Sequence, residues 1–226
     1  PDSALPVRPQ LGRGIEGLRI GFDQTYATKN VDAEVAAAIE QVVVRLRQLG
    51  AEIVEVAMPD LGNPTEIWYT LGTVEAALAH RATFPQRADE YGPGLRSDLE
   101  YGLQLDAVDY ARAARARAEI SGRVHAMLNG VDCFVCPSMS NTARKRSANP
   151  FEIDAEEWYR LVINDVFSKP FNFSGVPTLC VPCGFSSDGL PISAQFVGSQ
   201  LAEAKVLRAG HAYELATEWH DKHPPI

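Results

Sequence analysis

The four cysteines form two pairs with the spacing of metal-binding knuckles. Two residues separate Cys133 from Cys136, and two separate Cys180 from Cys183. Paired cysteines of this kind hold zinc in many small domains. Cys133 and Cys136, however, lie in an apolar run typical of a strand, in which residues i and i+3 point to opposite faces. The pattern therefore favours small buried thiols over a zinc site, and we expect no metal and no cofactor.

Nucleophilic chemistry has little support in the residue pattern. The five histidines are scattered, and the chain contains no Gly-x-Ser-x-Gly elbow, no GxGxxG and no phosphate-binding loop. Ser186 and Ser187 form the only Ser-Ser pair, and they lie beside Asp188 in a segment with turn chemistry. A Ser-His-Asp triad could still assemble in space, but the residue pattern points to none.

The segment 171–198 carries an unusual density of turn-forming residues. They precede one strand pattern, end it, and shape the turn into the next: Gly175, Pro177, Pro182, Gly184, Gly189 and Pro191. Glycine and proline at so many fixed places hold a backbone to one path. Such a path is compatible with plain architecture and with the wall of a binding site.

The elements that would position these segments begin with a βαβ unit over residues 18–56. Strand patterns at 18–22 and 52–56 flank a helix, for which Asp32 is the expected N-cap and Gly50 the expected stop. The helix has one apolar face, formed by Val35, Ile39, Val42, Leu46 and Leu49. The two strands should be parallel, with a right-handed crossover.

The rest of the chain alternates helix and strand patterns. In order, the sequence predicts helices within 63–128 with a break at 92–94, a strand at 132–136, a polar loop at 138–155, a helix at 156–167, a hairpin of strands 178–182 and 192–197, and a helix at 203–218. These elements predict an α/β fold of three α/β/α layers, with a mixed, largely parallel sheet covered by helices on both faces.

Composition narrows the class of protein. The 226 residues are 46% hydrophobic and 22% charged, with a net charge of −8, which disfavours a nucleic-acid partner. No apolar run reaches the ~18 residues of a membrane span. The start lacks a signal-peptide core and a methionine, so we expect a processed or truncated chain and take a cytoplasmic location as the default. Residues 1–17 should be an extended lead-in to a domain over 18–226.

The order of several motifs resembles the C-terminal half of the amidase signature family. The motifs are Asn172, Gly175-x-Pro177, Val181-Pro182-x-Gly184, Gly189-Leu190-Pro191 and Gln195-x-x-Gly198, with further matches at 18–21, 49–56, 132–138 and 219–225. The resemblance covers the chain from about residue 10 onward. It implies an enzyme that hydrolyses linear carboxamide C–N bonds through a serine nucleophile, a second serine and a neutral lysine.

The resemblance also implies that the chemistry lies elsewhere. The family's two serines belong to a Gly-Gly-Ser-Ser-Gly-Gly-Ser type of stretch in its N-terminal half, whereas this sequence has no Gly-Gly pair. The implied partners are that N-terminal catalytic half and a small-molecule amide substrate, and the isolated chain should be inactive. The half present here would supply pocket residues: Ser138, Asn141, Trp158, Asp165, Phe167, Phe171 and Asn172.

Four of the pocket candidates have an ordinary structural alternative. In relatives that act on glutamine, an acidic residue in this helix recognises the substrate amino group, and Asp165 would occupy that place. The residue pattern by itself favours an exposed helix carboxylate or a cap for Asp165. Trp158 and Phe167 are explained as core residues, and Asn172 as a side chain that ties down the turn before Gly175.

A different class of function stays open at this point. The chain could be a non-catalytic α/β binding or interaction module, or an inactive amidase relative. The half-enzyme hypothesis predicts an open strand edge and an apolar face. Either the partner covers them, or the chain associates with further copies of itself as a homo-oligomer.

Overall fold

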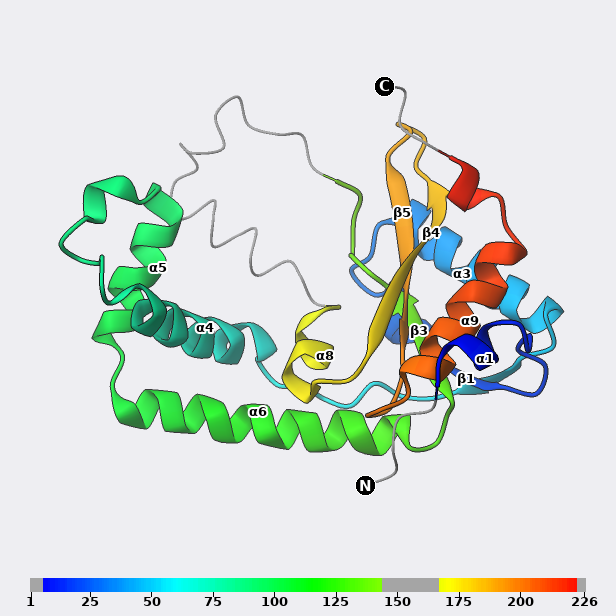
Figure 1. Ribbon diagram of the computed structural model, residues 1–226, viewed down its shortest axis with the longest axis horizontal. Helices are drawn as coiled ribbons and strands as arrows, with labels where there is room; N and C mark the ends of the chain where they lie inside the picture. Colours follow the sequence, from blue (N-terminus) through cyan, green and yellow to red (C-terminus); the bar gives the residue numbers. More distant parts are fainter. Residues whose placement is uncertain (1–5, 144–166, 223–226) are drawn as a thin grey trace.

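A computed structural model describes residues 6–143 and 167–222 of the chain (Figure 1). The elements run in the order α1 (Arg8–Leu11), β1 (Arg19–Phe22), α2 (Gln24–Thr28), α3 (Ala33–Gln48), β2 (Glu52–Glu55), α4 (Pro64–His80), η1 (Ala88–Glu90), α5 (Pro93–Gln104), α6 (Ala107–Leu128), β3 (Cys133–Pro137), α8 (Lys169–Ser174), β4 (Thr178–Phe185), β5 (Pro191–Val197), α9 (Glu203–Leu215) and η2 (Trp219–Asp221). None of the helices in these two ranges is both long enough and apolar enough to cross a bilayer.

The described strands form one mixed sheet in the order β2-β1-β3-β5-β4. β1 pairs in parallel with β2 and with β3, and β5 pairs antiparallel with β3 and with β4. All strands of this sheet except β5 therefore run in one direction. Helices cover both faces, with α3 and α9 on one side and α6 and α8 on the other (Figure 1). The predicted α/β class with a mixed sheet is confirmed.

The βαβ unit at the start of the sheet matches the sequence pattern closely. Arg19 pairs with Glu52 in parallel register, and α3 lies between the two strands in the chain. The Asp32 carboxylate caps α3 by accepting a hydrogen bond from the Glu34 amide at 2.9 Å. Gly50 follows the helix with φ at +88°, a conformation that glycine adopts without strain. Both predicted helix boundaries are confirmed.

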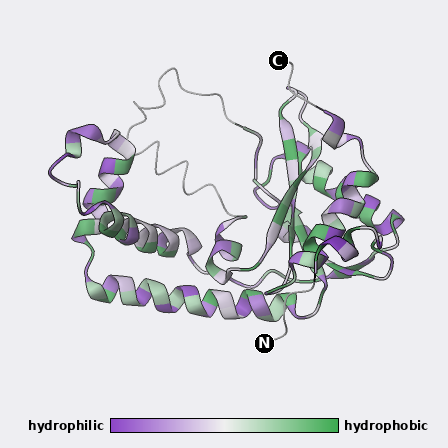
Figure 2. Cartoon of the chain, in the orientation of Figure 1, coloured by the Kyte–Doolittle hydropathy of each residue, from purple (hydrophilic) through white to green (hydrophobic). Residues whose placement is uncertain are grey.

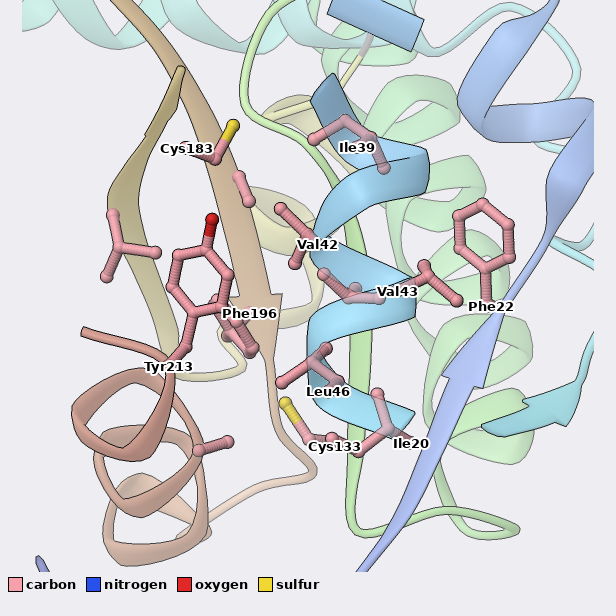
Figure 3. Close-up of a cluster of buried hydrophobic side chains, with 14 of the residues drawn as sticks. Ile20, Phe22, Ile39, Val42, Val43, Leu46, Cys133, Cys183, Phe196 and Tyr213 are labelled. Atoms are coloured by element: carbon pink, nitrogen blue, oxygen red, sulfur yellow. The ribbon is translucent and has the colours of Figure 1, made fainter. Parts of the chain in front are cut away.

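The apolar face of α3 forms the centre of the larger core. Ile39, Val42 and Leu46 are each 0% exposed, and they pack against the sheet face that also carries Phe196 and Cys133 (Figure 3). The opposite sheet face packs a second cluster against α6 and α8. The 3.6-residue period of α3 explains its place, because only an amphipathic helix presents such a face to a sheet.

Several boundaries differ from the sequence prediction. The lead-in contains one helical turn, α1, because Pro9 has a fixed φ suited to the first turn of a helix. Ile15, also within the lead-in, is 1% exposed and belongs to the core. Pro137 is the last residue of β3 rather than its stop, and the hairpin strands extend to Phe185 and back to Pro191. The predicted helix over 156–167 lies outside the described residues, apart from Phe167.

Helices α4 and α5 and the N-terminal part of α6 project from the sheet as an arm, whereas the C-terminal part of α6 packs on the sheet (Figure 1). The predicted long helix over 107–128 is confirmed with its bounds, and Asp106 starts it with a capping box shared with Asp109. The far part of the arm has a small core of its own, formed by Ala77, Phe84 and Leu99.

Candidate functional site

The parallel strands β2, β1 and β3 end at the same edge of the sheet, and a cleft lies there. From β1 the chain passes through α3 to β2 on one side, and it later returns to β3 on the other side. Open α/β sheets bind ligands at such a reversal of strand order, outside the carboxyl ends of the strands. The cleft has a volume of about 570 Å³. It is lined by Asp23, Thr25, Tyr26, Lys29, Asn30, Met58, Pro59, Asp60, Leu61, Gly62, Pro64, Ser140 and Phe167.

Asp23 fixes two walls of the cleft. It comes directly after β1 and caps α2, accepting a hydrogen bond from the Tyr26 amide at 3.0 Å. Its second carboxylate oxygen accepts from the Met58 amide at 2.7 Å, beyond the end of β2. Because each oxygen holds a backbone amide, Asp23 positions the walls of the cleft.

Two aromatic side chains meet at the floor. The ring of Phe167 lies edge-on to that of Tyr26, with centroids 4.9 Å apart. Phe167 is 1% exposed, and its carbonyl accepts a hydrogen bond from the Gln195 side-chain amide at 3.2 Å. The exposed side chains of Lys29 and Asn30 stand at the rim. An apolar floor with a polar rim suits a small molecule whose polar end meets the rim.

The predicted pocket residues Ser138, Asn141 and Phe167 gather at this edge of the sheet. Phe167 lines the cleft, and Ser138 and Asn141 flank Ser140, which also lines it. The Ser140 carbonyl accepts from the Asp32 amide at 2.8 Å, so the loop after β3 is held against the start of α3. The segment after β3 is thereby fixed beside the cleft.

The other predicted pocket residues lie apart from the cleft or outside the described ranges. Phe171 is 2% exposed in the core, with its ring centroid 6.3 Å from that of Phe134. Asn172 is exposed on α8 and lines a separate, smaller cleft. Trp158 and Asp165 lie outside the described residues.

Ser138 has an unusual hydroxyl group. Its Oγ is buried and has no hydrogen-bond partner, and it is the only buried side-chain oxygen or nitrogen in this state within the described parts of the chain. A buried hydroxyl without a partner costs free energy relative to a satisfied one. Ser138 lies two residues before Ser140, which lines the cleft, but it is not itself a lining residue.

The Ser-Ser pair has a structural role in the hairpin turn. The Ser186 hydroxyl accepts a hydrogen bond from the Leu190 amide at 3.1 Å, and the Ser187 amide donates to the Glu34 carboxylate at 2.8 Å. These contacts close the turn between β4 and β5 and attach it to α3. The position agrees with the turn that the sequence predicts for these serines.

The buried cysteines are poor nucleophiles. Cys133 and Cys136 lie in the clusters on opposite faces of the sheet, as their spacing predicts. The prediction of a buried thiol is wrong for Cys180, which is exposed on β4. Burial raises the pKa of the Cys133 thiol to about 12 and that of Cys183 to about 12, so both stay protonated near neutral pH. Within residues 6–143 and 167–222, no three His, Cys, Asp or Glu side chains are grouped closely enough to hold a metal ion.

The sequence reasoning missed the wall after β1. Asp23, Tyr26 and Lys29 all follow the first strand of the predicted βαβ unit. The signal was present, because residues directly after a parallel strand face the ligand-binding edge. What was missing was the position of β3, since only the sheet order shows where the strand order reverses.

Comparison with known proteins defines the family. The Amidase family model matches residues 2–207. An amidase of Pseudomonas putida is 35% identical over 217 residues, which cover 96% of this chain and 46% of that protein. A glutamyl-tRNA(Gln) amidotransferase chain of a Geobacter species is 28% identical over 96% of this chain and 48% of that one. A bacterial aryl acylamidase of the amidase signature family shares the fold, with a TM-score of 0.79 over 96% of this chain and 47% of that one, at 20% identity.

The chain belongs to the amidase signature family. It spans about half the length of the relatives that it matches, and it corresponds to their C-terminal part.

Proposed function

We propose that this chain is the pocket-bearing half of an amidase that hydrolyses a linear carboxamide C–N bond. The observation that carries the proposal is a family match over residues 2–207 in a chain that spans only about half of its relatives. The sequence has no Gly-Gly pair and so lacks a stretch of the Gly-Gly-Ser-Ser-Gly-Gly-Ser type. We therefore assign the nucleophile to a companion N-terminal half.

In this mechanism the companion serine attacks the amide carbonyl carbon, and its proton passes through a second serine to a neutral lysine. The C–N bond breaks, the amine leaves with a proton, and water hydrolyses the acyl-enzyme. The present chain binds the substrate and excludes water. Four free thiols, at Cys133, Cys136, Cys180 and Cys183, support a reducing compartment such as the cytoplasm.

The proposal is tested by assaying amide hydrolysis with the chain alone and with a companion half. We expect the isolated chain to show no turnover of a chromogenic anilide and the combined halves to show turnover. Denaturing mass spectrometry of the purified sample identifies which polypeptides are present. Turnover by a sample that contains this chain alone would place the nucleophile here and refute the proposal. Binding of amides without turnover in the combined halves would identify a non-catalytic module.

A substitution of Ser138 tests substrate binding independently of the stability of the fold. In the complete enzyme we expect Ser138→Ala to raise KM about tenfold, because a hydrogen bond to the substrate is worth roughly 1 kcal/mol or more. The free energy of unfolding of the isolated chain should stay the same or rise, because the hydroxyl has no partner there. A loss of stability with an unchanged KM would show that the hydroxyl has only a structural role.

Asp165 is proposed to bind the amino group of substrates that carry one. Asp165→Asn should raise KM for amides with a free α-amino group and leave KM unchanged for amides without it. Asp154→Asn, in the same stretch of sequence, is the matched control. Equal effects on both substrate classes would support the alternative role of a cap or an exposed carboxylate.

A further inference from the structure

A second groove lies between α3 and the chain that follows α9. It has a volume of about 660 Å³, and it shares no lining residue with the cleft at the ends of the parallel strands. One wall belongs to α3, and the other is formed by the end of α9 and the residues up to Trp219. Its residues take no part in the proposed hydrolysis.

The α3 wall presents a basic side chain without an acidic partner. Gln41, Val44, Arg45 and Gln48 are separated by three, one and three positions, which places them on one exposed face of the helix. The Arg45 guanidinium forms no ion pair with a carboxylate of the described residues. A planar guanidinium in this state is suited to bind a carboxylate through two parallel hydrogen bonds.

Tyr213 of α9 brings a neutral hydroxyl to the same groove. Its side chain is 3% exposed, and Figure 3 shows the hydroxyl pointing toward Cys183, which also lines the groove. Burial raises the pKa of Tyr213 to about 12, although the nearby Trp219 and Arg45 act in the opposite direction. At neutral pH the phenol therefore keeps its proton and can donate a hydrogen bond to an acceptor.

Apolar surface lies beside these donors. Leu215 is 70% exposed and Val44 is 40% exposed, and both line the groove. The Trp219 ring is partly buried, with its centroid 6.0 Å from that of Phe185, so the indole is held at the wall. Exposed apolar side chains next to a fixed aromatic ring suit a flat apolar group.

The charges at the groove favour an anion. Among the described residues that line it, Glu218 is the only acidic one, and its carboxylate pairs with the Lys222 ammonium at 3.5 Å. Arg45 is the only basic lining residue, and it lacks such a partner. The groove thus carries an uncompensated positive charge, although the chain as a whole has a net charge of −8.

We propose that the groove between α3 and Trp219 binds a small carboxylate with a flat apolar body. The carboxylate meets the Arg45 guanidinium and the Tyr213 hydroxyl. The apolar body lies against Trp219, Val44 and Leu215. A volume of about 660 Å³ accommodates a molecule of this kind. The inference does not depend on the proposed function, because binding is measured without hydrolysis.

The test measures binding of benzoate to the 226-residue chain. NMR follows the indole N–H signals, and Trp219→Phe identifies the signal of Trp219. We expect benzoate to shift this signal saturably, with a Kd of about 1 mM or below. Benzamide, the neutral isostere, should bind at least about tenfold more weakly, because it cannot form the charged pair. A Trp219 signal that does not respond to benzoate, or equal affinities for the two compounds, would overturn the proposal.

Two arginines of α3 provide a matched pair of variants. Arg45→Gln should raise the Kd for benzoate at least about tenfold, because a hydrogen bond between charged groups is lost. Arg47→Gln is the control, since Arg47 is exposed on the same helix but does not line the groove. It should leave the Kd unchanged, and both variants should keep the thermal unfolding of the parent. Equal weakening by the two would mean that benzoate responds only to overall charge, which contradicts a site at Arg45.

The same titration on the combined halves distinguishes a ligand site from an interface. We expect benzoate to shift the Trp219 signal of the combined halves with the affinity measured for the chain alone. Loss of this response would show that the companion half covers the groove, and our assignment of a carboxylate ligand would be wrong. That result leaves the proposed hydrolysis standing, because turnover of the anilide by the combined halves is measured separately.

Discussion

The sheet and the helical arm bury their apolar side chains in different ways. The sheet joins segments from residue 15 to residue 213 in one cluster, on which α3 and α9 pack. The far part of the arm buries three residues, Ala77, Phe84 and Leu99. Figure 2 shows hydrophobic strands in the sheet and a mixture of hydrophilic and hydrophobic residues along the arm.

The difference predicts that the sheet is the more stable part of the molecule and that the arm opens more easily. A large cluster that joins distant segments unfolds as a unit, whereas a small local cluster opens at lower free energy. Several large apolar side chains on the arm are exposed, including Leu78, Leu103 and Val108. The cleft lies at the end of the sheet, next to the part of the molecule with the larger core.

The largest expected effect tests whether the sheet core dominates stability. Ile39 and Leu99 are both 0% exposed, but they belong to the large and the small cluster respectively. Ile39→Ala should lower the free energy of unfolding by about 3 kcal/mol. Leu99→Ala should act chiefly on hydrogen exchange in α4 and α5. Urea unfolding and native-state hydrogen exchange measure the two effects. Equal global losses would show that the arm and the sheet unfold together.

A smaller effect is expected where α4 and α5 touch. A Cβ on Gly102 would overlap the backbone carbonyl of Thr73, so the two helices must separate. Gly102→Ala should destabilise the arm by about 2 kcal/mol.

The matched control for that substitution is Gly122→Ala in α6, where a Cβ meets nothing within 4 Å. It should stabilise the chain by about 0.5–1 kcal/mol, because alanine favours the helix. Thermal unfolding monitored by far-UV circular dichroism distinguishes the two variants. The same sign for both would contradict the close contact between α4 and α5.

The smallest effect concerns the end of the sheet opposite the cleft. Partial burial by itself would raise the pKa of Asp132. Hydrogen bonds from the Lys205 ammonium, at 2.7 Å, and from the Arg19 amide, at 2.9 Å, outweigh burial and lower that pKa. A lowered pKa in the folded state means that this stabilisation is present above the pKa of the unfolded chain, near 4, and is lost as pH falls below it.

Asp132→Asn should therefore cost about 1 kcal/mol at pH 7, because Lys205 is partly exposed and the pair is screened by solvent. The difference between the variant and the parent should shrink as pH falls below 4. Denaturant unfolding at a series of pH values measures it. A difference that is independent of pH would exclude the carboxylate charge as its source.

Elements with strong local patterns were predictable from the sequence. The face of α3, its cap at Asp32 and its stop at Gly50 are set by residues close in the chain. The bounds of α6 follow from Asp106 and an uninterrupted helical pattern. Of the predicted pocket residues, Phe167 lines the cleft, whereas Ser138 and Asn141 are chain neighbours of the lining residue Ser140. Their roles in binding stay predictions.

Other features depended on contacts between distant segments. The cleft wall formed by Asp23 and Met58 exists because a carboxylate after β1 meets an amide after β2. Phe171 is buried because α8 packs on β3. No spacing in the chain encodes either contact.

The sequence by itself determined the α/β class and the strongly patterned elements such as α3 and α6, because periodicity, caps and turn residues act over a few positions. The order of its motifs indicated the family. The tertiary structure alone decided the strand order β2-β1-β3-β5-β4 and the place of the cleft. Within the described residues, it also decided that Val181 of β4 is buried on one face of the sheet and that Thr178 and Cys180 are exposed on the other. These properties depend on which distant surfaces pack together, and burial of apolar area is nondirectional, so local residue patterns do not specify them.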